Sequence, residues 1–280
     1  MMMKLIAPDY YTKFQCIADR CRHSCCIGWV IDVDADTLEY YRSVEGALGE
    51  RLKNGIDEGG ETPHFILGEG ERCPFLNHTG LCDLITELGE ESLCQICTDH
   101  PRFRHFFADH TEIGLGLCCE EAGRRILGEE RPMKLIILED DGGNEPADPE
   151  EEELLALRES LFAMVQDRSL PIKQRMEKLL SAAEIDWTEW ADFLLSLERL
   201  DERWAELLDQ LPDAPLQPLT GWMEVPLEQL ICSLLYRHLP GALEDGDADS
   251  RIRFCALMWQ LIVRLCRQNG CESLEELVEY

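Results

Sequence analysis

Four cysteines stand close together in the segment CIADRCRHSCCIGW, which runs from Cys16 to Trp29. Six more follow before residue 120, at Cys73, Cys82, Cys94, Cys97, Cys118 and Cys119. Such a dense set of thiols points either to disulfide bonds or to metal binding. Cysteine thiolate is a soft ligand, which favours zinc or an iron–sulfur cluster over magnesium and calcium. We therefore expect this part of the chain to fold around an inorganic centre held by sulfur.

The start of the chain argues against disulfide bonds. Disulfides persist in oxidising compartments, and Met1 to Asp9 lacks the apolar stretch of a secretory signal peptide. We therefore expect a cytoplasmic protein whose clustered thiols are reduced and bind metal.

The spacing of the cysteines predicts clamps for metal but leaves the number of sites open. Cys94-x2-Cys97 is a spacing common in zinc and iron–sulfur sites. Side chains of neighbouring residues point in different directions, so Cys25 and Cys26 either serve two sites or include one spare thiol. One zinc ion or one cubane cluster uses four thiolates, and the ten candidates exceed that number. Spacing alone does not choose between zinc and a cluster.

Other ligands are weaker candidates. The histidines among the cysteines are secondary because the thiolates already exceed one four-coordinate site. The radical-type motif C-x3-C-x2-C is absent, because Gly28 stands at its third position after Cys21 and Cys25. The histidines concerned are His23, His78, His100, His105 and His110.

The composition is that of a globular protein and excludes two classes of function. The 280 residues include 56 acidic and 26 basic side chains, and the formal net charge is −30. A polyanion of this size does not bind nucleic acid through general phosphate contacts. No apolar run reaches the roughly 20 residues of a membrane-spanning helix.

An acidic stretch is expected to divide the chain into two domains. Residues 139–153 contain nine acids and no base, which predicts a linker between a cysteine-rich domain at 1–138 and a helical domain at 154–280. We expect a mainly α fold, with short antiparallel β-hairpins in the first domain and an α-helical bundle in the second. Expected hairpins pair 64–67 with 73–76 and 102–107 with 111–117; expected helices cover 34–41, 118–127, 154–165, 171–180, 187–211, 226–237 and 251–267.

Two side chains are candidates for holding an organic cofactor. Trp29 is suited to stacking on an adenine, and Arg102 to pairing with the carboxylate of an amino-acid-like cofactor. The alternatives are packing for Trp29 and an ordinary surface charge for Arg102. No glycine-rich nucleotide loop is present. The carboxylates available as general bases are Glu90, Glu91, Asp99 and Glu112, and none is preferred.

Several segments jointly resemble the flagellin lysine-N-methylases. They include Lys13 to Cys16, Cys25 to Trp29, Arg72 to Leu76, Gly80 to Cys82 and Leu115 to Ala122, within residues 3–130. More loosely, the order of cysteines is similar to that of zinc- or iron-chelating cysteine-cluster proteins.

The resemblance implies an S-adenosylmethionine-dependent protein-lysine N-methyltransferase that acts on flagellin and contains a [4Fe-4S] cluster. Cys119 stands where the family commonly has proline, so the resemblance leaves it out of the ligand set. Two alternatives remain: a non-enzymatic protein that binds zinc or iron and docks a partner on its helical domain, and a redox sensor acting through Cys94 and Cys97. The implied ligands are Cys16, Cys21, Cys25, Cys26, Cys73, Cys82, Cys94, Cys97 and Cys118.

Overall fold

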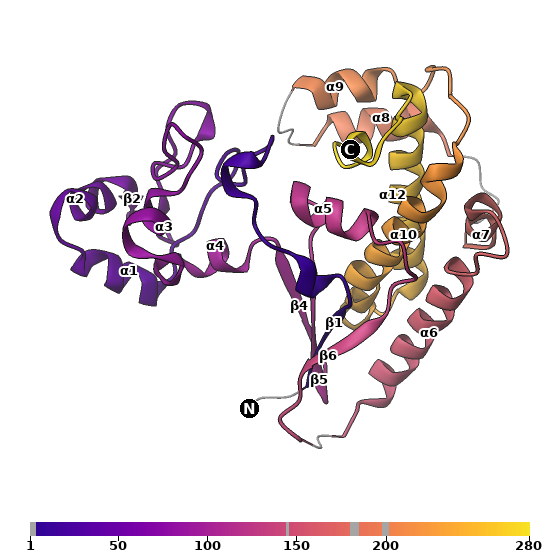
Figure 1. Ribbon diagram of the computed structural model, residues 1–280, viewed down its shortest axis with the longest axis horizontal. Helices are drawn as coiled ribbons and strands as arrows, with labels where there is room; N and C mark the ends of the chain where they lie inside the picture. Colours follow the sequence, from indigo (N-terminus) through magenta and orange to yellow (C-terminus); the bar gives the residue numbers. More distant parts are fainter. Residues whose placement is uncertain (1–3, 144–145, 180–184, 198–201) are drawn as a thin grey trace. The chain divides into compact units, whose positions relative to one another are not determined.

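The computed structural model describes residues 4–143, 146–179, 185–197 and 202–280. The fold is mainly helical, as expected, with a small mixed sheet (Figure 1). The strands are β1 (Lys4–Pro8), β2 (Ile56–Asp57), β3 (His64–Phe65), β4 (Arg102–Phe106), β5 (His110–Leu115) and β6 (Leu135–Glu139). The α-helices are α1 (Ala35–Ser43), α2 (Gly46–Gly55), α3 (Asp83–Leu88), α4 (Gln95–Asp99), α5 (Glu120–Leu127), α6 (Pro149–Val165), α7 (Ile172–Leu179), α8 (Trp187–Leu195), α9 (Glu202–Asp209), α10 (Glu224–His238), α11 (Ala242–Asp245), α12 (Ala248–Asn269) and α13 (Leu274–Leu277).

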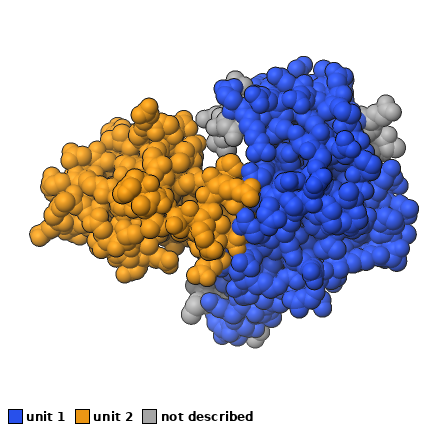
Figure 2. All heavy atoms as spheres, turned by 45° about the horizontal axis from the view of Figure 1, so that its top comes forward, with its two compact units in different colours: residues 1–14, 103–118, 122–280 blue, residues 15–102, 119–121 orange. Residues whose placement is uncertain are grey.

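The chain divides into two compact units, coloured separately in Figure 2. The first contains residues up to Phe14, residues 103–118 and residues from Ala122 onward, and the second contains residues 15–102 with 119–121. This division does not fall at the acidic stretch 139–153. Strand β6 ends at Glu139 and helix α6 begins at Pro149, both inside the first unit.

The four-stranded sheet of the first unit explains this division. Its strand order is β4-β5-β1-β6, and β1 runs parallel to β5 and antiparallel to β6. The expected hairpin of β4 and β5 is confirmed, and the Phe107 amide donates to the His110 carbonyl at 2.9 Å. Strands β1 and β6 were not predicted. Pairing between segments more than one hundred residues apart has no local turn signal, and it joins the start of the chain to the later helices.

Helices α6, α7, α10 and α12 pack together in the first unit (Figure 1). The hydroxyl of Tyr236 on α10 donates to the carbonyl of Ile113 on β5 at 3.2 Å. The four later cysteines are buried, as expected for core residues; they are Cys232, Cys255, Cys266 and Cys271. The expected helix over 187–211 is instead two helices, α8 and α9, and Leu180 lies outside the described residues. Within the described ranges, no helix combines the length and apolarity needed to cross a bilayer.

The second unit is built on short elements around its own core. Asp34 caps α1, as aspartate commonly does before the first turn of a helix, and its carboxylate accepts from the Thr37 amide at 3.0 Å. The hairpin predicted between 64–67 and 73–76 is wrong. Strand β3 pairs with β2, and the amide of Cys73 donates to the Cys26 carbonyl at 2.9 Å. This long-range pairing brings the first cysteine segment to the second.

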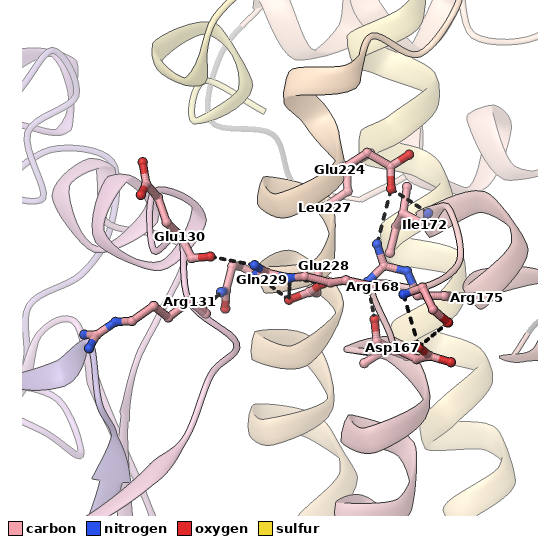
Figure 3. A network of polar contacts seen from close by, with 12 residues as sticks. Glu130, Arg131, Asp167, Arg168, Ile172, Arg175, Glu224, Leu227, Glu228 and Gln229 are labelled. Carbon is pink, nitrogen blue, oxygen red and sulfur yellow. Dashed lines mark hydrogen bonds and ion pairs between the residues drawn. The ribbon is translucent and has the colours of Figure 1, made fainter.

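A buried ion network joins α6, α7 and α10 within the first unit (Figure 3). The carboxylate of Glu228 has no exposed surface and accepts from Arg168 at 2.9 Å and from Arg175 at 2.5 Å. Arg175 also donates to the Val165 carbonyl at 2.7 Å. Removing the charge of one partner leaves the other buried without compensation, which costs more than the pair contributes.

We predict that Glu228→Gln lowers the free energy of unfolding by about 3 kcal/mol, because both arginines lose the buried carboxylate and Arg175 keeps only Glu224, at 3.2 Å. Urea denaturation of the wild type and the variant measures the difference. Glu244→Gln, at an exposed position, is the matched control and should change stability by less than about 0.5 kcal/mol. A Glu228→Gln variant as stable as the control would contradict the prediction.

Candidate metal centre

Five thiols gather beside the core of the second unit, and we call them the inner thiol group: Cys26, Cys73, Cys82, Cys94 and Cys97. Cys73 and Cys94 are buried, and the other three pack against the same apolar cluster. Burial raises the pKa of Cys73 to about 12, with further increases from the nearby thiolates of Cys26 and Cys82. The pKa of Cys97 is raised mainly by its hydrogen bond with Cys94 and by burial, and the thiolates of Cys26 and Cys73 add to that rise. Five members of the expected ligand set are therefore neighbours.

Backbone amides at turns and helix starts favour the anionic form of several inner thiols. Burial raises the pKa values of Cys73 and Cys82, and the amides two and three residues ahead oppose that rise. Cys82 and Cys94 are the N-cap residues of α3 and α4, where first-turn N–H groups carry partial positive charge. The amides that act on Cys73 and Cys82 belong to Phe75, Leu76, Leu84 and Ile85.

Cys94 and Cys97 form a hydrogen-bonded pair of thiols. The hydrogen bond from Cys97 lowers the pKa of Cys94, and the same bond raises the pKa of Cys97. The Cys97 thiol thus donates to the sulfur of Cys94. Metal binding would leave both sulfurs as anionic ligands, because it displaces thiol protons.

Cys26 is an inner thiol with a pKa near neutrality. Its hydrogen bond with Cys25 lowers the pKa to about 7, against the opposing effect of burial. The hydroxyl of Ser24 and the positive charge of Arg72 lower it further. A large part of Cys26 is therefore thiolate at neutral pH, which is the form that binds metal.

A second set of thiols, the outer thiol group, consists of Cys16, Cys25 and Cys119. The hydrogen bond with Cys26 raises the pKa of Cys25, as do burial and the charges of Cys16 and Cys119. Apart from the hydrogen bond that joins them, the adjacent residues Cys25 and Cys26 have different thiol neighbours. Cys119, which the resemblance omits, lies within this group.

Two other expected ligands are placed differently. Cys21 lies half-buried in the second unit, and Cys118 is exposed and belongs to the first unit. In the part of the chain that the structure describes, no three His, Cys, Asp or Glu side chains stand in a geometry that would hold a single ion. The fit to a metal centre thus comes from donor chemistry: soft thiols beside a dry core, several of them facing backbone N–H groups.

The histidine candidates separate between the units. His105 and His110 belong to the first unit, where Nδ1 of His110 lies 2.6 Å from the Asp109 carboxylate. His100 belongs to the second unit, and its ring centre is 6.3 Å from that of Trp29. Burial lowers the pKa of His100, and so does the charge of Arg102. His100 is therefore a neutral imidazole at pH 7.

The two cofactor candidates lie in the second unit. The indole nitrogen of Trp29 donates to the Cys25 carbonyl at 2.7 Å, which fixes the ring beside the cysteine segment. Arg102 donates to the Thr98 carbonyl at 3.3 Å, just after α4. Along the sequence, Trp29 comes shortly after Cys25 and Cys26, and Arg102 comes shortly after Cys97.

One of the four candidate bases has a clear structural role. The carboxylate of Glu112 is buried and accepts from Arg158 at 2.7 and 2.5 Å. Burial raises the pKa of Glu112. The hydrogen bonds and charges of His110 and Arg158 lower it by a larger amount, so the net shift is downward. Glu112 is thus a poor proton acceptor at neutral pH. Glu90 and Glu91 are exposed, and Asp99 accepts from Gln95 at 2.6 Å.

The inner thiol group also surrounds a residue that sequence patterns did not indicate. Tyr41 on α1 is 1% exposed, and its hydroxyl has no hydrogen-bond partner among the described residues. The thiolates of Cys94, Cys97 and Cys82 add to the effect of burial in raising its pKa. Its position at helical spacing in α1 resembles that of any core residue, so only the fold shows this proximity.

Comparison with known proteins supports the resemblance found in the sequence. The chain is 28% identical over 162 residues to proteins named lysine-N-methylase from Salmonella typhimurium and Salmonella choleraesuis, which covers 54% of this chain and 40% of each relative. It is 29% identical over 137 residues to a flagellar biosynthetic protein FliU from Salmonella muenchen, covering 46% of this chain and 79% of that protein. No family model and no solved structure matches. The resemblance to the lysine-N-methylase family is confirmed.

We predict that Cys26 is the inner thiol that reacts first with iodoacetamide in the reduced, metal-free protein. At pH 7.5 its labelling should be at least about tenfold faster than that of Cys73, because the thiolate is the nucleophile. Its rate should fall below pH 7, as the thiolate becomes protonated. Mass spectrometry of peptides from timed reactions measures both rates, with fully buried Cys232 as the internal control. Equal rates for Cys26 and Cys73 would contradict the assigned pKa values.

Proposed function

We propose that this chain, a relative of the flagellin lysine-N-methylases, transfers methyl groups from S-adenosylmethionine to lysine side chains of flagellin. We propose further that cysteines of its second unit hold an iron–sulfur cluster. The single observation that carries the methylase assignment is the similarity to proteins named lysine-N-methylase. The chain spans about two fifths of the length of those relatives, and FliU supports the flagellar connection.

The inner thiol group is the best-supported site for the metal centre. It offers five soft donors, more than a cubane cluster needs. Backbone N–H groups near the sulfurs of Cys73 and Cys82 stabilise anionic sulfur, and hydrogen bonds of this kind also tune bound clusters. The outer thiol group supplies further ligands or a second site. We propose Cys26, Cys73, Cys82, Cys94 and Cys97 as the primary ligand candidates.

The proposed reaction requires a neutral lysine and a dry, oriented methyl donor. S-adenosylmethionine supplies an electrophilic methyl group on a sulfonium sulfur. The chain must bind the lysine amine without its proton, which burial or a carboxylate achieves. We propose Trp29 and Arg102 as contacts for the donor, through stacking and carboxylate pairing. The acidic surface of the chain is complementary to a lysine-bearing partner.

A second function uses the same thiols without catalysis. Thiolates beside an apolar core would equally hold zinc or iron in a non-enzymatic protein whose helical unit docks a partner. The arrangement of Cys94 and Cys97 serves either function. The identity of the bound metal and the outcome of a methyl-transfer assay separate the two functions.

We predict that the protein, purified without oxygen, contains iron and acid-labile sulfide. The double variant Cys94→Ala/Cys97→Ala should lose most of both, with metal affinity lower by at least about tenfold. The matched control Cys232→Ala/Cys255→Ala removes two buried core thiols of the first unit and should retain wild-type iron. Iron equal to wild type in the first variant would exclude these cysteines as ligands. Zinc as the isolated metal would favour the non-enzymatic function.

We predict that the metal-loaded protein transfers isotope-labelled methyl groups from S-adenosylmethionine to purified flagellin. Intact-mass and peptide mass spectrometry locate the label on lysines. The Cys94→Ala/Cys97→Ala variant should transfer at least about tenfold less, because its metal centre is lost. If fully loaded wild-type protein leaves flagellin unmodified, the methylase assignment fails while the metal assignment stands.

A further inference from the structure

Among the residues that the structure describes, the buried hydroxyl of Tyr41 has no hydrogen-bond acceptor. The side chain is 1% exposed, and its ring packs against Phe65 with ring centres 6.3 Å apart. Leaving a buried hydroxyl unpaired costs about 1–3 kcal/mol. The buried Tyr236 hydroxyl, by contrast, donates to the Ile113 carbonyl. An unpaired phenol in a packed core therefore calls for a missing partner.

The surroundings of this hydroxyl indicate what the partner is. Tyr41 lies in the same buried cluster as Cys94, and Cys82 and Cys97 pack against that cluster. Burial is the main cause of the raised pKa of Tyr41, and the thiolates of these three cysteines add to it. The backbone N–H of Cys94 faces the phenol oxygen and lowers the pKa. No hydrogen bond to this hydroxyl forms among the described residues, so its proton still needs an acceptor.

The candidate acceptors are the sulfurs of Cys82, Cys94 and Cys97. A neutral thiol accepts a hydrogen bond weakly, whereas an anionic sulfur accepts a charge-assisted bond about twice as strong as a neutral one. Sulfur stays anionic when it is bound to metal, because metal binding displaces the thiol proton. The Tyr41 hydroxyl would therefore have a strong acceptor when these cysteines bind metal.

We infer that the Tyr41 hydroxyl donates a hydrogen bond to a metal-bound sulfur at the inner thiol group, as a positioning residue that tunes the centre. This inference rests on the metal centre of the proposed function. The acceptor is a cysteinate of Cys82, Cys94 or Cys97, or an inorganic sulfide next to them. Hydrogen bonds to sulfur stabilise the more negative, reduced state of a cluster and so raise its reduction potential.

The test compares three proteins purified and reconstituted without oxygen: wild type, Tyr41→Phe and Tyr40→Phe. Tyr40 is the matched control because it lies next to Tyr41 on α1 but is 43% exposed. All three should bind the same iron and sulfide. Redox titration followed by electron paramagnetic resonance should give a more negative potential for Tyr41→Phe alone. Equal potentials for Tyr41→Phe and wild type, at equal iron content, would overturn the inference.

A second variant covers failure of Tyr41→Phe to fold or load. Site-specific replacement of Tyr41 with a ring-fluorinated tyrosine keeps the shape and makes the phenol a stronger donor. The potential should then shift in the positive direction, and an unchanged potential would overturn the inference. If the wild type holds zinc, cobalt(II) replaces it, and Tyr41→Phe should move the sulfur-to-cobalt absorption to longer wavelength; an unmoved band would overturn the inference. Wild-type protein that binds no metal overturns the proposed centre itself, a result distinct from equal potentials.

Discussion

The main physical constraint on the second unit is that several thiols lie close together beside an apolar core. Anionic sulfurs repel one another, and burial penalises their charge, as the raised pKa of Cys73 shows. Backbone amides at turns and helix starts offset part of that penalty, and a bound cation or cluster would offset the rest. This constraint explains why the cysteines sit at the N-caps of the short helices α3 and α4.

The first unit is stabilised in a different way. Its small sheet recruits the start of the chain through β1, and helices α6 and α10 bury paired charges such as Glu112 with Arg158 and Glu228 with Arg175. Such pairs add orientation rather than much net stability, because desolvation consumes most of their attraction. The helices of this unit thus have fixed contacts to one another and to the sheet.

Particular residues show which features of the structure were predictable from the sequence. The clustered cysteines, the Asp34 cap and the β4–β5 hairpin were predictable, because each depends on residues close together in the chain. The pairing of β3 with β2 and the return of Cys73 to Cys26 were not, because the glycines at 68 and 70 resemble a hairpin turn. The resemblance left Cys119 out of the ligand set, and the structure places it beside Cys25. Tyr41 had no distinguishing signal, since core and site tyrosines share the same helical spacing.

The amino-acid sequence by itself determined the chemistry: soft sulfur ligands in excess of one site, a strongly acidic surface and mostly helical segments. Those properties follow from residue type and local spacing. Only the tertiary structure decided which thiols are neighbours, that the adjacent Cys25 and Cys26 face different groups, and that a tyrosine hydroxyl lies among the inner sulfurs. The physical reason is that long-range strand and loop pairing sets these proximities, and such pairing depends on the packing of the whole core rather than on any one segment.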